Sequence, residues 1–239
     1  MNTTERFATA LIEAHRSGLR ADGTALPAPT HAEALAIQSL VQAQLGPVGG
    51  FKGARRADGP DVIAPIGATR IRANGADVPV RDRMGIELEV GFEVLAVPDA
   101  DPLRDPASWV RPCVLLELVD MRLDGVSEDP MKKLADGIFN DGLVIGAKME
   151  GWTGADFTTV TASLTCGDRQ VIDGARQIPG GSALATLDML WTLARSHCGG
   201  LREGQFLITG SLSGLEYFPA GTQVAGRIEG LGDVACSLV

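Results

Sequence analysis

Acidic residues alternate with apolar ones in the segment Ile86-Glu87-Leu88-Glu89-Val90-Gly91-Phe92-Glu93-Val94. Successive side chains of a β-strand point to opposite faces of the sheet, so this period predicts a strand with one fully apolar face. Glu87 and Glu89 then share the other face. A solvated sheet face would carry the same pattern, and for these two residues taken alone it is the simpler interpretation.

A third glutamate, Glu117, interrupts the apolar run Val114-Leu115-Leu116-Glu117-Leu118-Val119. Burying an unpaired charge costs roughly several kcal/mol, so a carboxylate inside such a run needs a partner. A divalent cation is the simplest partner that three carboxylates can share, and Mg2+ and Mn2+ prefer oxygen ligands. The sequence is therefore compatible with a metal site or with a plain polar face at Glu87, Glu89 and Glu117.

The composition is that of a globular chain that can bury a sizeable core. It has 239 residues, of which 45% are hydrophobic and 21% charged, with a net charge of −9. This acidic balance, without a long run of Lys and Arg, argues against nucleic acid and anionic membrane surfaces as partners. No apolar stretch approaches the roughly 20 residues that span a bilayer, and the first residues lack a signal-type apolar core, so we expect a cytoplasmic protein. Four widely spaced cysteines are expected to be reduced thiols.

Three segments of the sequence have the apolar spacing and the end signals of helices. The first predicted helix runs from Glu5 to His15 with Thr3 or Thr4 as its cap. The second follows the capping box Thr30-His31-Ala32-Glu33 and ends at Gly46, with an apolar face formed by Ala34, Ile37, Leu40, Val41 and Leu45. The third begins after Ser182 and ends at Gly199-Gly200.

Strand-type runs dominate the rest of the chain from residue 78 onward. They cover residues 78–80, 86–94, 114–119, 143–148, 157–165, 169–172, 206–209, 223–228 and 234–239. The glycine- and proline-rich stretch before them, residues 48–71, is interpreted as loop. The sequence thus predicts an α+β protein, with a small helical N-terminal portion (1–70) and a β-rich catalytic domain (71–239). Neither a G-x-G-x-x-G nor a P-loop motif follows a strand, so a nucleotide is not expected.

Lys52 lies among glycines, in Gly49-Gly50-Phe51-Lys52-Gly53. Glycine lets the backbone approach a ligand closely. Arg55 and Arg56 follow, and in an acidic protein this cluster could receive a substrate carboxylate. A solvated loop with charged residues would look the same in sequence.

Further candidate functional residues lie in less distinctive sequence patterns. Asp136, before Gly137, could bind a metal through water, orient a catalytic group or form a turn. Thr209, Gly210 and Ser211 end an apolar run and could contact a substrate carboxylate, although a hairpin would have the same sequence pattern. Asp120 and Arg122 suggest a local ion pair. The three histidines lie in or beside predicted helices, which disfavours a Ser-His or Cys-His nucleophile.

The order and spacing of these motifs resemble a known family. Gly-Phe-Lys-Gly (50–53), Glu-Leu-Glu (87–89), Leu-Glu-Leu-Val-Asp-Met-Arg (116–122), Ala-Asp-Gly (135–137) and Gly-Gln-Phe-Leu-Ile-Thr-Gly-Ser (204–211) follow one another, and Pro-Ala-Gly-Thr-Gln-Val-Ala-Gly (219–226) comes last. This looks like the 2-keto-4-pentenoate hydratase/4-oxalocrotonate decarboxylase family of the fumarylacetoacetate hydrolase superfamily. The resemblance spans nearly the whole chain.

The resemblance implies a mixed β-sandwich roll and a Mg2+ or Mn2+ ion. Its metal ligands fall on Glu87, Glu89 and Glu117, its active-site lysine on Lys52, and the Asp of its Ala-Asp-Asn segment on Asp136. The chain departs from the family pattern at Gly53-Ala54-Arg55-Arg56 and at Gly137. An acid common in the loop after the lysine has only Asp58 and Asp61 as candidates.

The expected activity is that of a metal-dependent hydro-lyase, a hydratase that converts a 2-hydroxy-2,4-dienoate or 2-oxo-4-enoate into a 4-hydroxy-2-oxo acid. A 4-oxalocrotonate-type decarboxylase would use the same enolate stabilisation. A hydrolase or tautomerase of 2,4-dioxo acids and a non-catalytic partner subunit are also compatible with the sequence. The chain shows no His-Glu pair of the kind that activates water in hydrolases of the superfamily. The resemblance also implies a homo-oligomer or a complex with a paired pathway enzyme.

Overall fold

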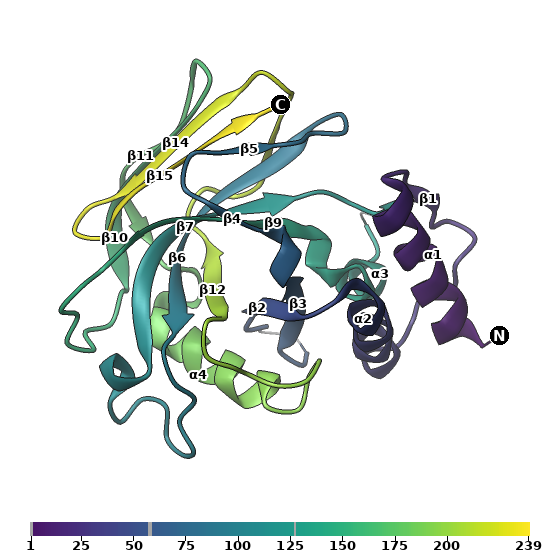
Figure 1. Cartoon of the computed structure of the whole chain (residues 1–239), viewed down its shortest axis with the longest axis horizontal. Coiled ribbons are helices and arrows are strands. Elements are labelled where there is room, and N and C mark those ends of the chain that lie inside the picture. The colour runs from purple at the N-terminus through teal and green to yellow at the C-terminus, as the bar shows by residue number, and fades with distance from the viewer. Residues whose placement is uncertain (1, 57–58, 127) are drawn as a thin grey trace.

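The computed structural model describes residues 2–56, 59–126 and 128–239, and its strands form two large sheets. The larger sheet has eight strands in the order β3-β2-β12-β6-β7-β9-β4, with β13 paired to β6; the smaller has the order β11-β10-β14-β15-β5. Figure 1 shows the smaller sheet at the upper left above the larger one, with three helices gathered at the right. The strands are β1 (Ala21–Asp22), β2 (Val48–Ala54), β3 (Val62–Gly67), β4 (Ile71–Ala73), β5 (Ala76–Val78), β6 (Met84–Val94), β7 (Val110–Val119), β8 (Leu123–Asp124), β9 (Asn140–Lys148), β10 (Thr159–Cys166), β11 (Arg169–Gln177), β12 (Phe206–Ser211), β13 (Glu216–Phe218), β14 (Gln223–Ile228) and β15 (Gly232–Leu238).

The helices flank these sheets. They are α1 (Thr3–Ser17), α2 (His31–Leu45), α3 (Pro130–Ala135) and α4 (Ala183–Ala194), with short 3-10 turns η1 (Ala68–Arg70), η2 (Pro106–Ser108), η3 (Gly137–Phe139) and η4 (Pro179–Gly181). Ser182 caps α4 as predicted. The helix ends at Ala194, however, before the predicted glycines.

The main core lies between the two sheets and under α4. Leu88 and Val90 of β6 pack there with Leu164 of β10 and Leu187 of α4, all fully buried. These are the apolar positions of the alternating segment, so the predicted strand and its apolar face are confirmed. A second cluster joins α1, α2 and α3, and includes Phe7, Leu11 and Ile37. A third lines the opposite face of the large sheet with Leu115, Ile145 and Ile208.

Two details of the N-terminal helices differ from the prediction. Asn2 rather than a threonine caps α1, because its side chain accepts the Glu5 amide while the Glu5 carboxylate returns to the Asn2 amide. Leu40, predicted on the apolar face of α2, is 43% exposed. The Thr30 capping box is confirmed.

The stretch predicted as a glycine-rich loop forms β2 and β3, so that prediction was wrong. Gly50 lies against the Phe206 backbone of β12, where a Cβ would come within 2.2 Å of the carbonyl oxygen. The glycines therefore permit close strand packing rather than flexibility. Because β2 and β3 belong to the large sheet, residue 70 does not coincide with a boundary between sheets. Among the described residues, no helix has the length and apolar character needed to cross a membrane.

Candidate active site

Strands β6 and β7 bring the three predicted metal ligands together. They pair antiparallel with Glu87 directly opposite Glu117, and Glu89 lies two residues further along the same face. Opposed side chains on one face have Cβ atoms about 4.5–5.5 Å apart. One carboxylate oxygen from each of the three lies within 4.8 Å of the others. The arrangement thus follows from strand register alone.

The acids lie inside the molecule rather than on a wet sheet face. Glu89 is 2% exposed and Glu117 is 1% exposed, while Glu87 is partly buried. Their face of the sheet continues into the apolar cluster of Leu115 and Ile208, and the opposite face packs into the main core. A plain polar face is therefore excluded for Glu89 and Glu117.

Burial and mutual repulsion disfavour the charged forms of two of these acids. Burial raises the pKa of Glu89 well above its ordinary value, and the charges of Glu117 and Glu87 raise it further. Burial and Glu117 raise the pKa of Glu87, against the opposing effect of Lys52. The protein alone therefore does not neutralise the cluster.

Lys52 and Asn140 both contact Glu117. The Lys52 ammonium forms an ion pair with Oε1 of Glu117, and Asn140 Nδ2 donates to the same oxygen at 2.8 Å. Lys52 also donates to the Ile138 carbonyl at 3.4 Å. Strand β2 carries Lys52 to this position because it pairs in parallel with β12, with Lys52 beside Ile208.

A β-bulge in β12 orients Glu89. Two residues, Thr209 and Gly210, stand opposite Val90 of β6 where the register shifts. Gly210 has a φ of 109°, and its N–H donates to Glu89 Oε2 at 2.7 Å instead of to the sheet ladder. A left-handed backbone of this kind favours glycine. The bulge thus adds a fixed donor to the carboxylate cluster.

The donor set fits a hard divalent cation. When all three acids are ionised, their charges exceed the single ammonium of Lys52 by two in a buried place, and a divalent cation compensates this excess. All three ligands offer oxygen, which suits Mg2+ or Mn2+ better than softer metals. Glu87, Glu89 and Glu117 would hold such an ion.

Asp136 is held by Arg122 rather than facing the carboxylate cluster with free oxygens. Arg122 Nε donates to Asp136 Oδ1 at 2.7 Å, and the Arg122 amide donates to Oδ2 at 2.9 Å. Arg122 also donates to the carbonyls of Asp136 and Asn140, both at 2.7 Å. These bonds fix the turn between Asp136 and Asn140, which carries the Ile138 carbonyl that Lys52 contacts.

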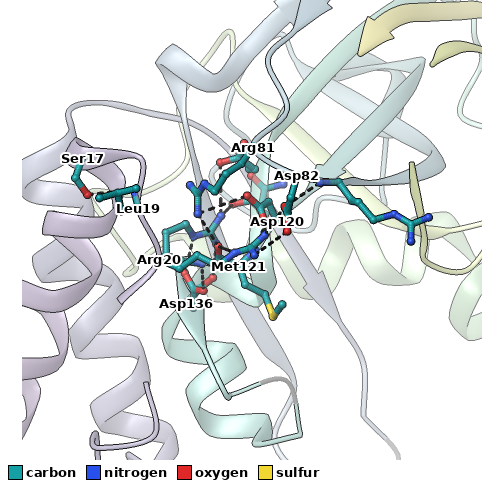
Figure 2. A network of polar contacts seen from close by, with 12 residues as sticks. Ser17, Leu19, Arg20, Arg81, Asp82, Asp120, Met121 and Asp136 are labelled. Carbon is teal, nitrogen blue, oxygen red and sulfur yellow. Dashed lines mark hydrogen bonds and ion pairs between the residues drawn. The ribbon is translucent and has the colours of Figure 1, made fainter. Parts of the chain in front are cut away.

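The predicted local pair of Asp120 with Arg122 was therefore wrong. Asp120 accepts from Arg20 Nη2 at 2.6 Å, and Arg20 also forms two bonds with Asp82. Figure 2 shows this network, in which Arg20 and Arg81 approach the two aspartates. Asp120 and Arg122 thus each bond to a residue from another part of the chain, Asp120 to Arg20 and Arg122 to Asp136.

The remaining predicted substrate contacts are spread along two strands. Arg55 and Arg56 are exposed at the end of β2, and the Arg56 amide donates to Asp61 at 3.0 Å. Thr209 is buried and donates to the Val90 carbonyl at 2.8 Å. Ser211 Oγ lies 3.2 Å from Ser213 Oγ. Substrate contact by these residues stays a prediction, and Asp58 lies outside the described residues.

Sequence reasoning missed Asn140 and the role of the Gly210 amide. Asn140 opens β9, four residues after Asp136, in a stretch interpreted only as a turn. Asn140 belongs to no recognisable sequence motif. A register shift of β7 against β9 near Val119 brings it to Glu117, and neither strand's own pattern reveals that shift.

No family model matches the sequence, and no curated protein sequence matches it either. Among solved structures, 4-oxalocrotonate decarboxylase from Pseudomonas putida G7, complexed with magnesium and adipate, superposes with a TM-score of 0.81 and 17% identity, over 100% of this chain and 99% of that chain. The chain has the fold of 4-oxalocrotonate decarboxylase.

Further solved structures share part of this fold. The same decarboxylase complexed with calcium and acetate gives a TM-score of 0.80 at 18% identity, over 99% of this chain and 97% of that chain. A 2-hydroxyhepta-2,4-diene-1,7-dioate isomerase from Mycobacterium marinum gives 0.59 at 14% identity, over 81% and 76% of the two chains. The resemblance drawn from the sequence motifs is thereby confirmed at the level of the fold, and so is the predicted α+β class.

Proposed function

We propose that this protein is a divalent-metal-dependent lyase that hydrates a small 2-hydroxy-2,4-dienoic or 2-oxo-4-enoic acid. The observation that carries the proposal is the buried cluster of Glu87, Glu89 and Glu117 with Lys52 at its edge. Mg2+ or Mn2+ would, when bound, supply Lewis-acid stabilisation of the negative charge that develops on the substrate.

The residues around the cluster supply position and proton transfer. Asn140 and the Gly210 amide hold Glu117 and Glu89 in place, so the carboxylates need little rearrangement when they act. Lys52 Nζ is the one cationic donor among the described residues that contacts the cluster. It would bind the substrate carboxylate or carry a proton to and from the substrate carbon chain. Asp136 and Arg122 act through the turn that places the Ile138 carbonyl against Lys52.

Decarboxylation of a 2-oxo acid of the 4-oxalocrotonate type is the second candidate. It is favoured by the full-length superposition on 4-oxalocrotonate decarboxylase, which includes the N-terminal helices. Loss of CO2 and addition of water both begin with stabilisation of charge at the same end of the substrate. The two reactions differ in their products, and products therefore decide between them.

The deciding experiment follows enzymatically generated 2-hydroxypenta-2,4-dienoate and 4-oxalocrotonate with Mg2+, with Mn2+ and with EDTA. Wild type should consume one substrate only when the metal is present, and Glu117→Gln should lose this turnover. Glu203→Gln, an exposed glutamate in a loop, is the matched control and should keep it. A 4-hydroxy-2-oxo acid as product identifies the hydratase, and release of CO2 identifies the decarboxylase. Turnover that persists in EDTA and in Glu117→Gln would overturn the proposal.

A further inference from the structure

A cavity separate from the carboxylate cluster lies between the N-terminal helices and the large sheet. It has a volume of about 130 Å³ and is bordered by α1, α2, η1 and the start of β9. Its lining includes His15, Arg70, Arg122, Asp136, Asp141 and Asn140, which also donates to Glu117, but neither Lys52 nor any of the three clustered glutamates. Because one water takes up about 30 Å³ in the liquid, there is room for a molecule of the size of acetate or pyruvate.

His15 faces this cavity without a partner. Within residues 2–56, 59–126 and 128–239, no group forms a hydrogen bond with its imidazole, although the ring is mostly buried. Burial and the charges of Arg122, Arg70 and Arg81 lower its pKa to about 3, so the ring is neutral and offers one N–H donor. The ring nitrogens are not fully buried, so the N–H is accessible from the cavity and can donate to a molecule bound there.

Of the two arginines that border the cavity, one retains free hydrogen-bond donors. Arg122 donates its side-chain hydrogen bonds to Asp136 and Asn140, and its charge compensates that of Asp136. Asp141 lies between two arginines, 3.6 Å from Arg122 and 3.4 Å from Arg70. The Arg70 side chain is 37% exposed and its Asp141 contact is long, so its guanidinium retains donors for another anion.

We propose that this cavity binds a small organic monocarboxylate, which accepts hydrogen bonds from Arg70 and from His15. The carboxylate would replace water at the free guanidinium donors, and Thr69 on η1 borders the same space. The two arginines and two aspartates that border the cavity balance in charge, so a monoanion leaves less excess negative charge there than a dianion does. A dianion such as phosphate is disfavoured because Asp136 and Asp141 also border the cavity. The proposal does not rest on the proposed reaction, although Asn140 borders both this cavity and Glu117.

The test uses the side-chain NMR signals of the three histidines in the metal-free full-length protein. His15→Gln assigns the His15 signal, and sodium acetate and sodium pyruvate are titrated against sodium chloride at constant ionic strength. The expected result is a saturable shift of the His15 signal in wild type. Arg70→Gln should weaken binding by about tenfold or more, since it removes the charge-assisted donor.

Two controls make the outcome unambiguous. Arg227→Gln removes an exposed arginine of the smaller sheet and should leave the titration unchanged. Glu87→Gln alters the carboxylate cluster without touching Asn140 and should also leave the titration unchanged, which separates this site from the proposed active site. An absent or non-saturating shift, an equal affinity in Arg70→Gln, or tighter binding of inorganic phosphate than of acetate would each overturn the proposal. Circular dichroism of Arg70→Gln establishes that the variant is folded.

Discussion

Lys52 and Asn140 donate to the same oxygen of Glu117, Oε1, and no donor among the described residues bonds to Oε2. One oxygen is thus held by the protein while the other remains for a ligand. Groups that orient a metal-binding carboxylate in this way typically change metal affinity by about 10- to 100-fold when removed.

Asn140→Leu should therefore weaken Mg2+ binding by about 10- to 100-fold, because Glu117 loses one of its two fixed donors. Isothermal titration calorimetry of the metal-free protein measures this directly. Gln44→Leu, which removes an exposed amide on α2, is the matched control. Equal Mg2+ affinities for Asn140→Leu and wild type would show that Asn140 does not orient the ligand.

Metal should stabilise the wild-type fold by mass action. At a free Mg2+ concentration of 100 times Kd, the free energy of unfolding should rise by about 2.7 kcal/mol. Differential scanning calorimetry with and without EDTA would report this as a higher Tm. Glu117→Gln should show little or no rise, and a rise equal to that of wild type would place the ion elsewhere.

Glu89 should make the metal-free protein less stable as the pH rises. Its pKa in the folded state is raised from the ordinary value of 4.5, chiefly by burial. Below that value the carboxyl is protonated in both states and has no cost, whereas above its raised folded pKa the folded state must carry the buried charge. In EDTA, Glu89→Gln should therefore have a higher Tm than wild type at pH 8, with the difference vanishing below about pH 4.5.

The control for this prediction is the same comparison with saturating Mg2+. The ion compensates the charge of Glu89 in wild type, so the advantage of Glu89→Gln at pH 8 should disappear or reverse. If the Tm difference between Glu89→Gln and wild type in EDTA does not vary with pH, ionisation of Glu89 does not destabilise the folded state.

Breaking the buried pair of Arg122 with Asp136 should cost far more than breaking an exposed one. Both residues are 2% exposed, and removal of one partner leaves a buried charge, which typically costs about 3–5 kcal/mol. Arg122→Met should show this loss in urea unfolding. Arg227→Met breaks the exposed pair with Asp233 and should cost less than about 1 kcal/mol. Similar losses of unfolding free energy in Arg122→Met and Arg227→Met would contradict a stabilising buried pair of Arg122 with Asp136.

Gly210→Ala should affect both stability and metal binding. At a φ of 109° a side chain is strained, and the new Cβ would lie 3.0 Å from Pro179. Such strain costs about 1–3 kcal/mol. The bulge would shift, the amide would leave Glu89, and Mg2+ affinity should fall. Gly230→Ala, at a φ of 75° in an open turn, provides a control with backbone strain but without the contact to Glu89. Unchanged Mg2+ affinity in Gly210→Ala would show that this amide does not support the ligand.

The acid cluster was predictable because it depends on local rules. Strand period places Glu87 and Glu89 on one face, and the apolar neighbours of Glu117 indicate burial. The pairing of Glu87 with Glu117 is then the register that buries both apolar faces. The capping box at Thr30 was predictable for the same reason, since its residues are three positions apart.

Other features depend on contacts that no local pattern encodes. The glycines of β2 look like a loop in sequence, and only the close approach of β12 explains them. Arg122 and Asp120 are near in sequence but bond to Asp136 and to Arg20, so proximity along the chain misled the prediction. The bulge at Gly210 requires the register of two strands that are more than a hundred residues apart.

The order of strands in the large sheet also governs when the site can exist during synthesis. Strand β12 is inserted between β2, which carries Lys52, and β6, which carries Glu87 and Glu89. Until residues 206–211 have left the ribosome, the lysine has no strand to hold it beside the acids. Contacts of such long sequence separation form slowly. A nascent chain therefore lacks the complete centre until β12 has been made, and metal binding then stabilises a chain that already contains β2, β6, β7 and β12.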